Sequence, residues 1–242
     1  FLRITVHKKL LFLICFSLFL SSKAHSQDTR DAVRDKNQSW YASASFATAI
    51  WSSDYWNERY SSGADAVVSH DSAKFEDFNN YSLGFGYRTG KFQVDLVYED
   101  FGTVNWVIGR TVDNSARIFD NGVLSVESAN LMAQVSYDLY QSDKNNIFML
   151  LGLGQSEHYI DTAYLMISGV RVDYAAPNTE TNTSYRLGVG NRYKLNENLA
   201  LEAKLNYSDY GRALNKHNTT GLKSYNIKMQ AVEAGVSLKY YF

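Results

Sequence analysis

Hydrophobic and polar residues alternate along most of the chain with the two-residue period of a β-strand. In residues 231–242 the apolar side chains fall on one face, the charged ones fall on the other, and the chain ends on that strand at Phe242. The same alternation recurs in seven earlier segments. The pattern therefore predicts eight strands, whose apolar faces begin at Trp40, Tyr81, Phe92, Leu131, Ile147, Tyr185, Leu199 and Val232.

The connections between these strands alternate in length. Short polar turns lie near residues 89–91, 141–146 and 196–198, and the long connections cover residues 51–77, 101–127, 157–184 and 209–223. Connections in compact domains have a median of about 4–6 residues. Successive connections of an antiparallel barrel lie on opposite sides, so all short turns would share one side of a membrane, as in outer-membrane barrels. A soluble barrel gives no reason for this asymmetry.

Aromatic residues cluster at both ends of the predicted strands. The chain has 18 Tyr and 13 Phe but one Pro, which favours strands. No apolar stretch after the N-terminal region reaches the roughly 18 residues of a membrane helix, but a strand shows lipid only every second residue. We expect two interfacial girdles, one of Tyr81, Tyr98, Tyr185 and Tyr207 and one of Tyr87, Phe92, Tyr137, Tyr193 and Tyr240.

The N-terminal region has the pattern of a secretory signal. Basic residues precede an apolar run from Leu10 to Leu20, and Ala24 and Ser26 supply small residues for cleavage. The alternative, a membrane anchor, would need roughly 20 apolar residues. We interpret residues 1–26 as a signal peptide, residues 27–37 as a periplasmic segment and residues 38–242 as the barrel.

Removal of the signal changes the charge and the cysteine content. Four of the 24 Lys and Arg residues lie within it, so 20 remain against 25 Asp and Glu, a net charge of −5. This balance gives no indication of a nucleic-acid partner. Cys15 is the only cysteine and lies in the signal, so the mature chain is expected to have neither disulfides nor thiolate chemistry.

Three segments resemble the small eight-stranded outer-membrane barrels, the superfamily of the opacity proteins and of the transmembrane domain of outer-membrane protein A. They are the aromatic-glycine strand 81–87, the hairpin from 187–193 to 199–205, and the terminal strand 235–242. The resemblance implies an all-β, eight-stranded antiparallel up-and-down transmembrane β-barrel, monomeric, in the bacterial outer membrane. Its surface loops would act in adhesion, host interaction, envelope integrity or small-solute passage.

The same resemblance implies partners. Lipid and lipopolysaccharide would surround the barrel, and the barrel-assembly machinery would recognise a terminal signal that contains Tyr240 and Phe242. The aromatic residues of the first long loop could contact a host or environmental ligand, or they could belong to the interfacial girdle. They are Trp51, Tyr55, Trp56 and Tyr60.

Ten charged residues fall on the inward face of the predicted barrel, five of each sign. Eight strands enclose a space that side chains can just fill, so we expect these charges to pair into a plug. The alternatives are a narrow channel for small solutes or the solvated face of a soluble sheet. We expect Arg186 and Lys204 to find partners among Glu99, Glu202 and Glu233, and the inward glycines to make room for Arg and Lys. The ten are Arg88, Asp95, Glu99, Asp138, Arg186, Arg192, Glu202, Lys204, Glu233 and Lys239.

Candidate catalytic and metal-binding residues are few. The alternative of a lipid-modifying enzyme, as some eight-stranded outer-membrane barrels are, needs a Ser, a His and an orienting acid together. Ser156 and His158 could share a strand face, but Glu157 could not and no further carboxylate accompanies them, so the sequence predicts no enzyme. Three histidines and no mature cysteine offer no metal-ligand spacing, and no cofactor is expected. Asn121-Gly122 predicts a hairpin turn. Segments rich in β-forming residues within the long loops predict that strands continue beyond the membrane; they are residues 104–108, 159–166 and 170–174.

Overall fold

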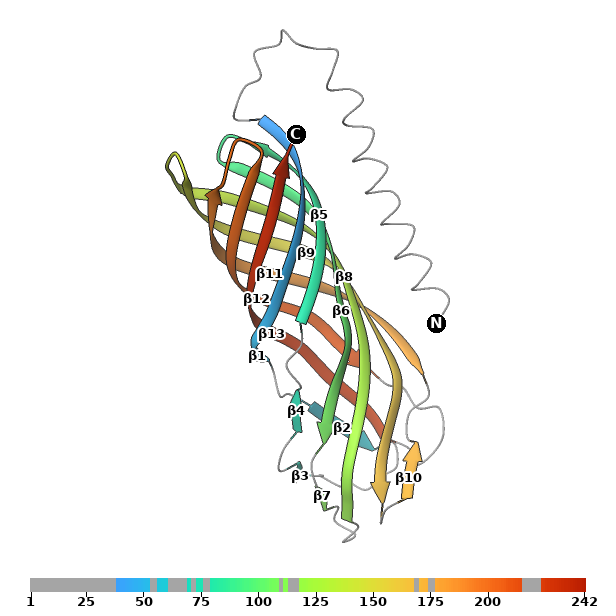
Figure 1. Ribbon diagram of the computed structural model, residues 1–242. Coiled ribbons are helices and arrows are strands. Elements are labelled where there is room, and N and C mark those ends of the chain that lie inside the picture. Colours follow the sequence, from blue (N-terminus) through green and yellow to red (C-terminus); the bar gives the residue numbers. More distant parts are fainter. Residues whose placement is uncertain are drawn as a thin grey trace.

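Eight long strands close into one antiparallel barrel (Figure 1), which confirms the predicted fold class. This computed structural model describes residues 38–52, 56–60, 69–70, 73–75, 79–108, 111–112, 118–167, 170–173, 177–214 and 223–242. The predicted signal peptide and the segment 27–37 lie outside these residues. The barrel strands are β1 (Gln38–Ser52), β5 (Asn79–Thr89), β6 (Phe92–Ile108), β8 (Ile118–Gln141), β9 (Asn145–Ile167), β11 (Asn178–Lys194), β12 (Leu199–Leu214) and β13 (Lys223–Tyr241).

The first and last strands close the ring. β1 pairs with β13 through partners such as Ala44 and Leu238, and with β5 through partners such as Ala44 and Leu83. Five short strands add to the long ones outside the ring order. They are β2 (Trp56–Tyr60), β3 (Ser69–His70), β4 (Ala73–Phe75), β7 (Thr111–Val112) and β10 (Val170–Asp173).

The two ends of the barrel differ as the connection lengths predicted. The tight turns at 90–91, 142–144 and 195–198 lie at the end that carries Phe242, uppermost in Figure 1. The short strands β3, β7 and β10 lie at the opposite end, below in that view. We call the first end periplasmic and the second extracellular, as in barrels of this architecture.

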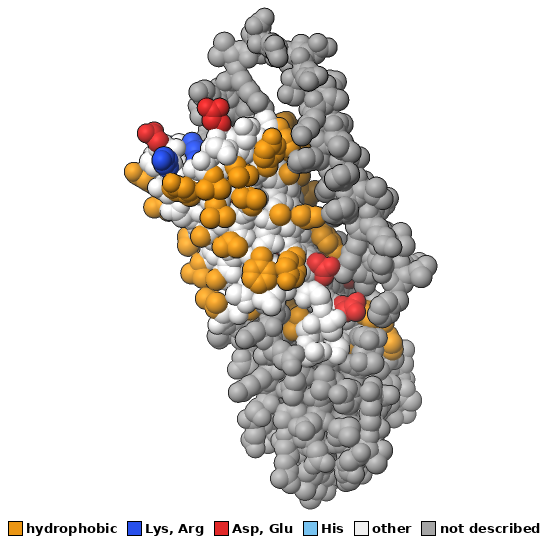
Figure 2. Space-filling model, in the orientation of Figure 1, with side chains coloured by type: hydrophobic (Ala, Val, Ile, Leu, Met, Phe, Trp, Pro, Cys, Tyr) orange, Lys and Arg blue, Asp and Glu red, His pale blue; other side chains and the backbone are white. Residues whose placement is uncertain are grey.

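Apolar side chains form a belt on the outside of the barrel (Figure 2). Leu153 is 65% exposed and Val189 is 54% exposed, although neither has a polar atom in its side chain. Rings cover the rims of the belt: the rings of Trp40 and Tyr87 pack in a tilted arrangement with centroids 4.9 Å apart, and those of Phe46 and Tyr81 do so with centroids 5.3 Å apart. A closed barrel with this much exposed apolar surface fits a lipid environment. Within the described ranges, no helix is long and apolar enough to span a membrane.

The strands continue well beyond the belt on the extracellular side. The ladder between β8 and β9 runs from Gln141 paired with Asn146 to Phe119 paired with Ile167, and β10 adds to β9. The prediction of strands beyond the membrane is confirmed. The prediction of a turn at Asn121-Gly122 is wrong, because both residues lie inside β8, which pairs with β9 along this stretch.

Two matching bulges interrupt the ladders just outside the belt. They consist of Asp100-Phe101-Gly102 in β6 and Asp209-Tyr210-Gly211 in β12, each at a register shift. Each glycine has a positive φ, 62° at Gly102 and 82° at Gly211, and donates its N–H to the preceding aspartate at 2.9 and 2.8 Å. The extra residue shifts the inward phase of the strand, so the next buried positions are Val104 and Ala213.

Candidate functional site: the charged lumen

The periplasmic half of the lumen is filled by an inner charge layer centred on Arg192. The guanidinium of Arg192 donates to Glu202 at 2.6 Å, to Asp138 at 3.0 Å and to the side-chain oxygen of Gln93 at 2.6 Å. Its side chain is fully buried. β11 places Arg192 inward because outward Tyr193 follows it on the alternating strand. Four strands are thereby tied together across the barrel.

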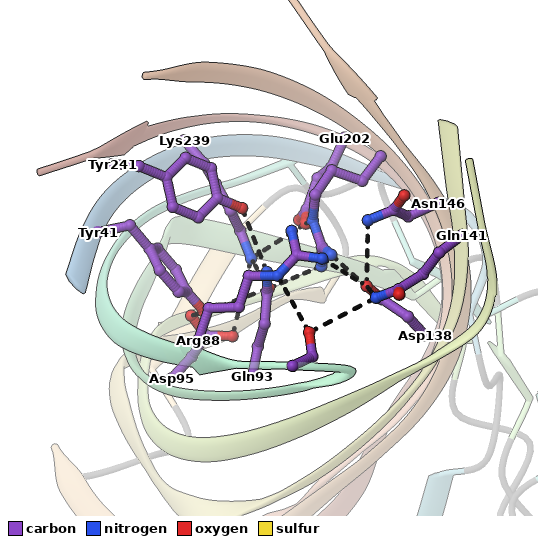
Figure 3. Close-up of polar contacts among 12 residues, drawn as sticks. Tyr41, Arg88, Gln93, Asp95, Asp138, Gln141, Asn146, Glu202, Lys239 and Tyr241 are labelled. Carbon is purple, nitrogen blue, oxygen red and sulfur yellow. Dashed lines mark hydrogen bonds and ion pairs between the residues drawn. The ribbon is translucent and has the colours of Figure 1, made fainter. Parts of the chain in front are cut away.

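Further side chains extend this inner layer (Figure 3). Asp138 also accepts from Arg88 at 3.0 Å. Lys239 lies 3.0 Å from Glu202 and 3.9 Å from Asp95, and its ammonium lies 4.5 Å from the centroid of the Tyr41 ring. The Tyr41 hydroxyl donates to Asp95. Each carboxylate of the layer therefore has at least one charged or hydroxyl donor.

An outer charge layer lies at the level of the extracellular girdle. Arg186 donates to both oxygens of Glu99 at 2.7 and 3.0 Å, and to Glu233 at 3.3 Å. Glu233 also accepts from Asn80 at 2.7 Å and from Ser208 at 2.7 Å. All three charged side chains are almost completely buried. Arg186 thus meets two of the three carboxylates expected for it, and one cation serves two anions.

Lys204 lies between the two layers and differs from the other nine charges. It makes no ion pair and donates no hydrogen bond among the residues that the structure describes. The inward glycines also serve a different purpose from the one expected. A Cβ at Gly86 would collide with Tyr41 and Asp95, and one at Gly190 would collide with Phe148. The glycines therefore admit neighbouring aromatic and acidic side chains more than Arg and Lys.

Above the outer layer the interior becomes apolar. The rings of Phe101 and Tyr210, one from each bulge, meet edge to face with centroids 4.7 Å apart. β6 and β12 lie on opposite sides of the ring, because the same number of strands separates them in either direction. The two rings therefore form an aromatic crossbar over the lumen. Val104, Val126 and Ile160 continue the buried apolar surface beyond it.

A buried histidine fixes the β12 bulge from the side. His158 Nε2 donates to the Tyr210 carbonyl at 2.7 Å, which leaves Nδ1 to accept from the Ser128 hydroxyl at 2.8 Å. Burial lowers the pKa of His158, and the hydrogen bond to the Tyr210 carbonyl partly opposes this. Ser156 donates to the same carbonyl rather than to His158. The pairing of Ser156 with His158 considered from the sequence does not form.

We compared the chain with known protein families, curated proteins and solved structures. No family model matches the sequence, and no curated protein does. The outer membrane protein OprG from Pseudomonas aeruginosa matches with a TM-score of 0.52 at 12% identity, over 84% of this chain and 95% of that one. The chain has the fold of the small outer-membrane β-barrels.

Two further outer-membrane barrels have lower TM-scores. Neisserial surface protein A matches at 0.43 and 15% identity, over 84% of this chain and 97% of that one. Ail, the attachment invasion locus protein of Yersinia pestis, solved with the heparin analogue sucrose octasulfate, matches at 0.39 and 10% identity, over 85% and 99%.

The aromatic residues predicted as a loop surface fall partly on strands. Trp51 lies in β1, and Trp56 and Tyr60 begin and end β2, which pairs with β13. Tyr55 lies outside the described residues, and the side chains of the other three are not described. At the other end of the barrel, Phe242 donates its N–H to the Trp40 carbonyl at 3.0 Å, which ties the terminus to β1.

The crossbar was missed in the sequence, although an internal repeat marks it. The hairpins β5–β6 and β11–β12 share the order Tyr-x-Leu-Gly-x-Gly-x-Arg followed by Leu-x-Tyr-x-Asp-aromatic-Gly. The repeats begin at Tyr81 and Tyr185, and they end at the two bulges. Self-comparison of the chain at a spacing of roughly a hundred residues would have revealed both. The described residues contain no cluster of three metal-ligating side chains.

Proposed function

We propose that the protein is a closed, non-enzymatic barrel of the bacterial outer membrane that acts through the β-structure it holds outside the membrane. The observation that carries this proposal is the filling of the lumen by two successive layers of buried ion pairs. An ion on its way through would have to displace Arg192 from Glu202 and then Arg186 from Glu99. Removing one partner of a buried pair typically costs about 3–5 kcal/mol.

The aromatic crossbar adds a third barrier. Phe101 and Tyr210 are both almost completely buried and span the barrel at the edge of the outer layer, where the Tyr210 hydroxyl accepts from Arg186 at 2.6 Å and donates to Glu233 at 2.9 Å. An apolar constriction opposes the entry of hydrated ions, because dewetting makes it a barrier. The two charged layers on the periplasmic side of the crossbar and the apolar residues on its extracellular side therefore favour a plugged barrel rather than a water-filled pore.

The extracellular half has the features of a rigid stem. Its strands remain paired beyond the membrane belt and enclose Val104, Val126 and Ile160 as a small apolar core. A stem of this kind holds the connecting segments away from the lipid surface. We infer that these segments serve adhesion, host interaction or envelope interaction, with Trp51, Tyr55, Trp56 and Tyr60 as candidate contact residues.

Planar-bilayer recording tests the plug directly. The purified wild-type barrel should show no steady conductance. Glu233→Gln removes one anion that Arg186 contacts, so it should lower stability to denaturant, raise conductance, or do both. Glu157→Gln, an exposed position on β9, is the matched control and should behave as wild type. Steady conductance of the wild type, unchanged in Glu233→Gln, would establish the narrow channel instead.

A trimmed barrel tests the role of the stem. Residues 105–125 can be replaced by Asn-Gly, because the flanking residues Val104 and Val126 are cross-strand partners. The variant should still fold and shift its gel migration on boiling, while intact cells that carry it lose binding to immobilised host glycans or matrix proteins relative to wild type. If the trimmed variant keeps all of this binding, the binding surface lies in the other connections or in the lumen and not in residues 105–125.

The non-enzymatic assignment has its own test. The Ser128 hydroxyl and His158 form the hydroxyl–imidazole pair of a nucleophile, but both are buried and a backbone carbonyl takes the place of an orienting acid. Ser128→Ala should leave the lipid A and phospholipid species of the cell unchanged by mass spectrometry, as should deletion of the whole protein. A lipid species that disappears in both strains would identify an enzyme.

A further inference from the structure

A small cavity lies between the two charge layers, in the middle of the membrane-spanning barrel. It has room for about one water-sized particle. Its wall combines hydroxyl groups, charged groups and three apolar side chains. The lining residues on which the argument depends are Ser136, Lys204, Lys239, Asp95 and Glu202.

Lys204 is the surplus cation of this region. Its cross-strand neighbours are Gly190 on β11 and Gly235 on β13, so neither adjacent strand offers it a side chain. The inner layer and Lys204 together hold four cations, Arg88, Arg192, Lys204 and Lys239, against the three carboxylates of Asp95, Asp138 and Glu202. Those carboxylates are already bound by other donors. Lys204 is half-buried inside the closed lumen, and a cation in such a place favours a nearby counter-charge.

Ser136 gives a second and independent indication of an occupant. The residue is 2% exposed and lines the same cavity, and its hydroxyl oxygen has no hydrogen-bond partner in the part of the chain that the structure describes. Buried hydroxyl groups in folded proteins nearly always have a partner. An unpartnered donor and an unpartnered cation thus face one space of the size of a single small particle.

We propose that this cavity binds one small monovalent anion of the size of chloride, held by the Lys204 ammonium and the Ser136 hydroxyl. Such an anion accepts from both donors and lies directly beside the Lys204 ammonium. The ten lumen charges balance in sum, but the additional carboxylate belongs to the outer layer around Arg186. A water molecule would satisfy Ser136 but leave Lys204 without a local counter-charge. The site does not depend on whether the barrel conducts, because it requires only that the cavity exchange with solvent during folding.

Halide-dependent stability provides the test. The barrel is folded in sodium chloride, sodium bromide or sodium gluconate at equal ionic strength and then unfolded in urea. An anion that binds only the folded state raises the unfolding midpoint as its concentration increases. Wild type should unfold at higher urea in chloride and in bromide than in gluconate, which is too large for the cavity. Lys204→Met should lose the difference between salts, and Ser136→Ala should reduce it.

Matched variants and diffraction complete the design. Lys144→Met changes an exposed lysine in the 142–144 turn and should keep the full halide effect. Crystals grown in bromide should show an anomalous peak beside Lys204, which also decides the matter if Lys204→Met fails to fold. Equal midpoints in chloride and gluconate, or no bromide peak in the cavity, would overturn the proposal and assign a water molecule to the site. Bilayer conductance reports on the plug separately.

Discussion

The membrane-spanning half and the extracellular half of this barrel place their polar and apolar side chains in opposite ways. β11 shows the contrast within one strand, because its outward positions change from Thr179, Thr181 and Thr183 to Tyr185 without any change of phase. Inside, the buried charges of Arg186 and Arg192 give way to Val104, Val126 and Ile160 beyond the girdle. The boundary between two solvents can therefore be located to within one or two residues.

This contrast shows that each half is stabilised by a different interaction. In the membrane half, lipid surrounds the barrel, so apolar side chains gain nothing by turning into the lumen. This half is stabilised instead by its closed hydrogen-bond ladders and its paired charges. In the extracellular half, water lies outside, and the hydrophobic effect favours the small apolar core. The bulges at Gly102 and Gly211 mark the transition in β6 and β12.

Loss of the outer ion-pair layer should have the largest effect on stability. Arg186→Met leaves Glu99 and Glu233 buried without their shared cation, which should lower the free energy of unfolding by about 3–5 kcal/mol. Urea titration followed by gel migration measures the change. Arg212→Met, at an exposed position in the extracellular half, should stay within about 0.5 kcal/mol. Equal losses in both variants would mean that the layer is not the main support of the lumen.

The stability cost of an outward lysine on β11 should depend on whether the position lies inside or outside the lipid belt. Val189→Lys places a charge near the middle of the lipid belt and should cost about 2–4 kcal/mol. Thr181→Lys, on the same face of the same strand but outside the belt, should cost less than about 0.5 kcal/mol. The same urea titration compares the two. A similar cost at both positions would contradict the assigned boundary.

The two bulges should respond unequally to the same substitution. Alanine at a positive φ costs about 1–2 kcal/mol, so Gly102→Ala and Gly211→Ala should both destabilise the barrel. Gly211→Ala should cost more, since the added Cβ would collide with Asn182, whereas Gly102 faces open space. Unfolding midpoints of the two variants provide the measurement. If Gly102→Ala were the more destabilising change, the packing described around the β12 bulge would be incorrect.

The smallest expected effect is the response of the extracellular half to acid. The unfolded chain binds a proton at His158 near pH 6.5, whereas in the folded barrel burial lowers the pKa of His158. Above about pH 6.5, His158 is neutral in both states and does not lower the free energy of unfolding. As the pH falls below this value, only the unfolded chain binds the proton, so the free energy of unfolding decreases until the pH reaches the pKa of the folded state. Urea midpoints at pH 7.5 and 5.5 should differ more for wild type than for His158→Gln. An identical pH difference in the two proteins would exclude this histidine as its source.

The architecture could be predicted because strand period and membrane topology are local properties. Alternation assigned the outward positions of β9, including Leu151 and Leu153, and the connection lengths assigned both sides of the barrel. The Asn121-Gly122 turn was predicted wrongly because turn propensity is weaker than the pairing of β8 with β9, which continues through both residues after a register shift beside Asn121. Pattern alone did not show that Lys204 lacks a carboxylate partner among the described residues, since it does not state which side chains share one height in a tilted barrel.

The sequence by itself determined the number of strands, the lipid-facing side of each, the side of the long connections and the presence of ten inward charges. Those properties follow from a two-residue period and from the requirement that every backbone group in lipid be paired. Only the tertiary structure decided that Arg186 serves both Glu99 and Glu233, that Phe101 meets Tyr210 across the lumen, and that Lys204 has no carboxylate partner within the described residues. Each of these contacts joins strands that are distant in sequence, and their relative heights are fixed by register and bulges when the ring closes.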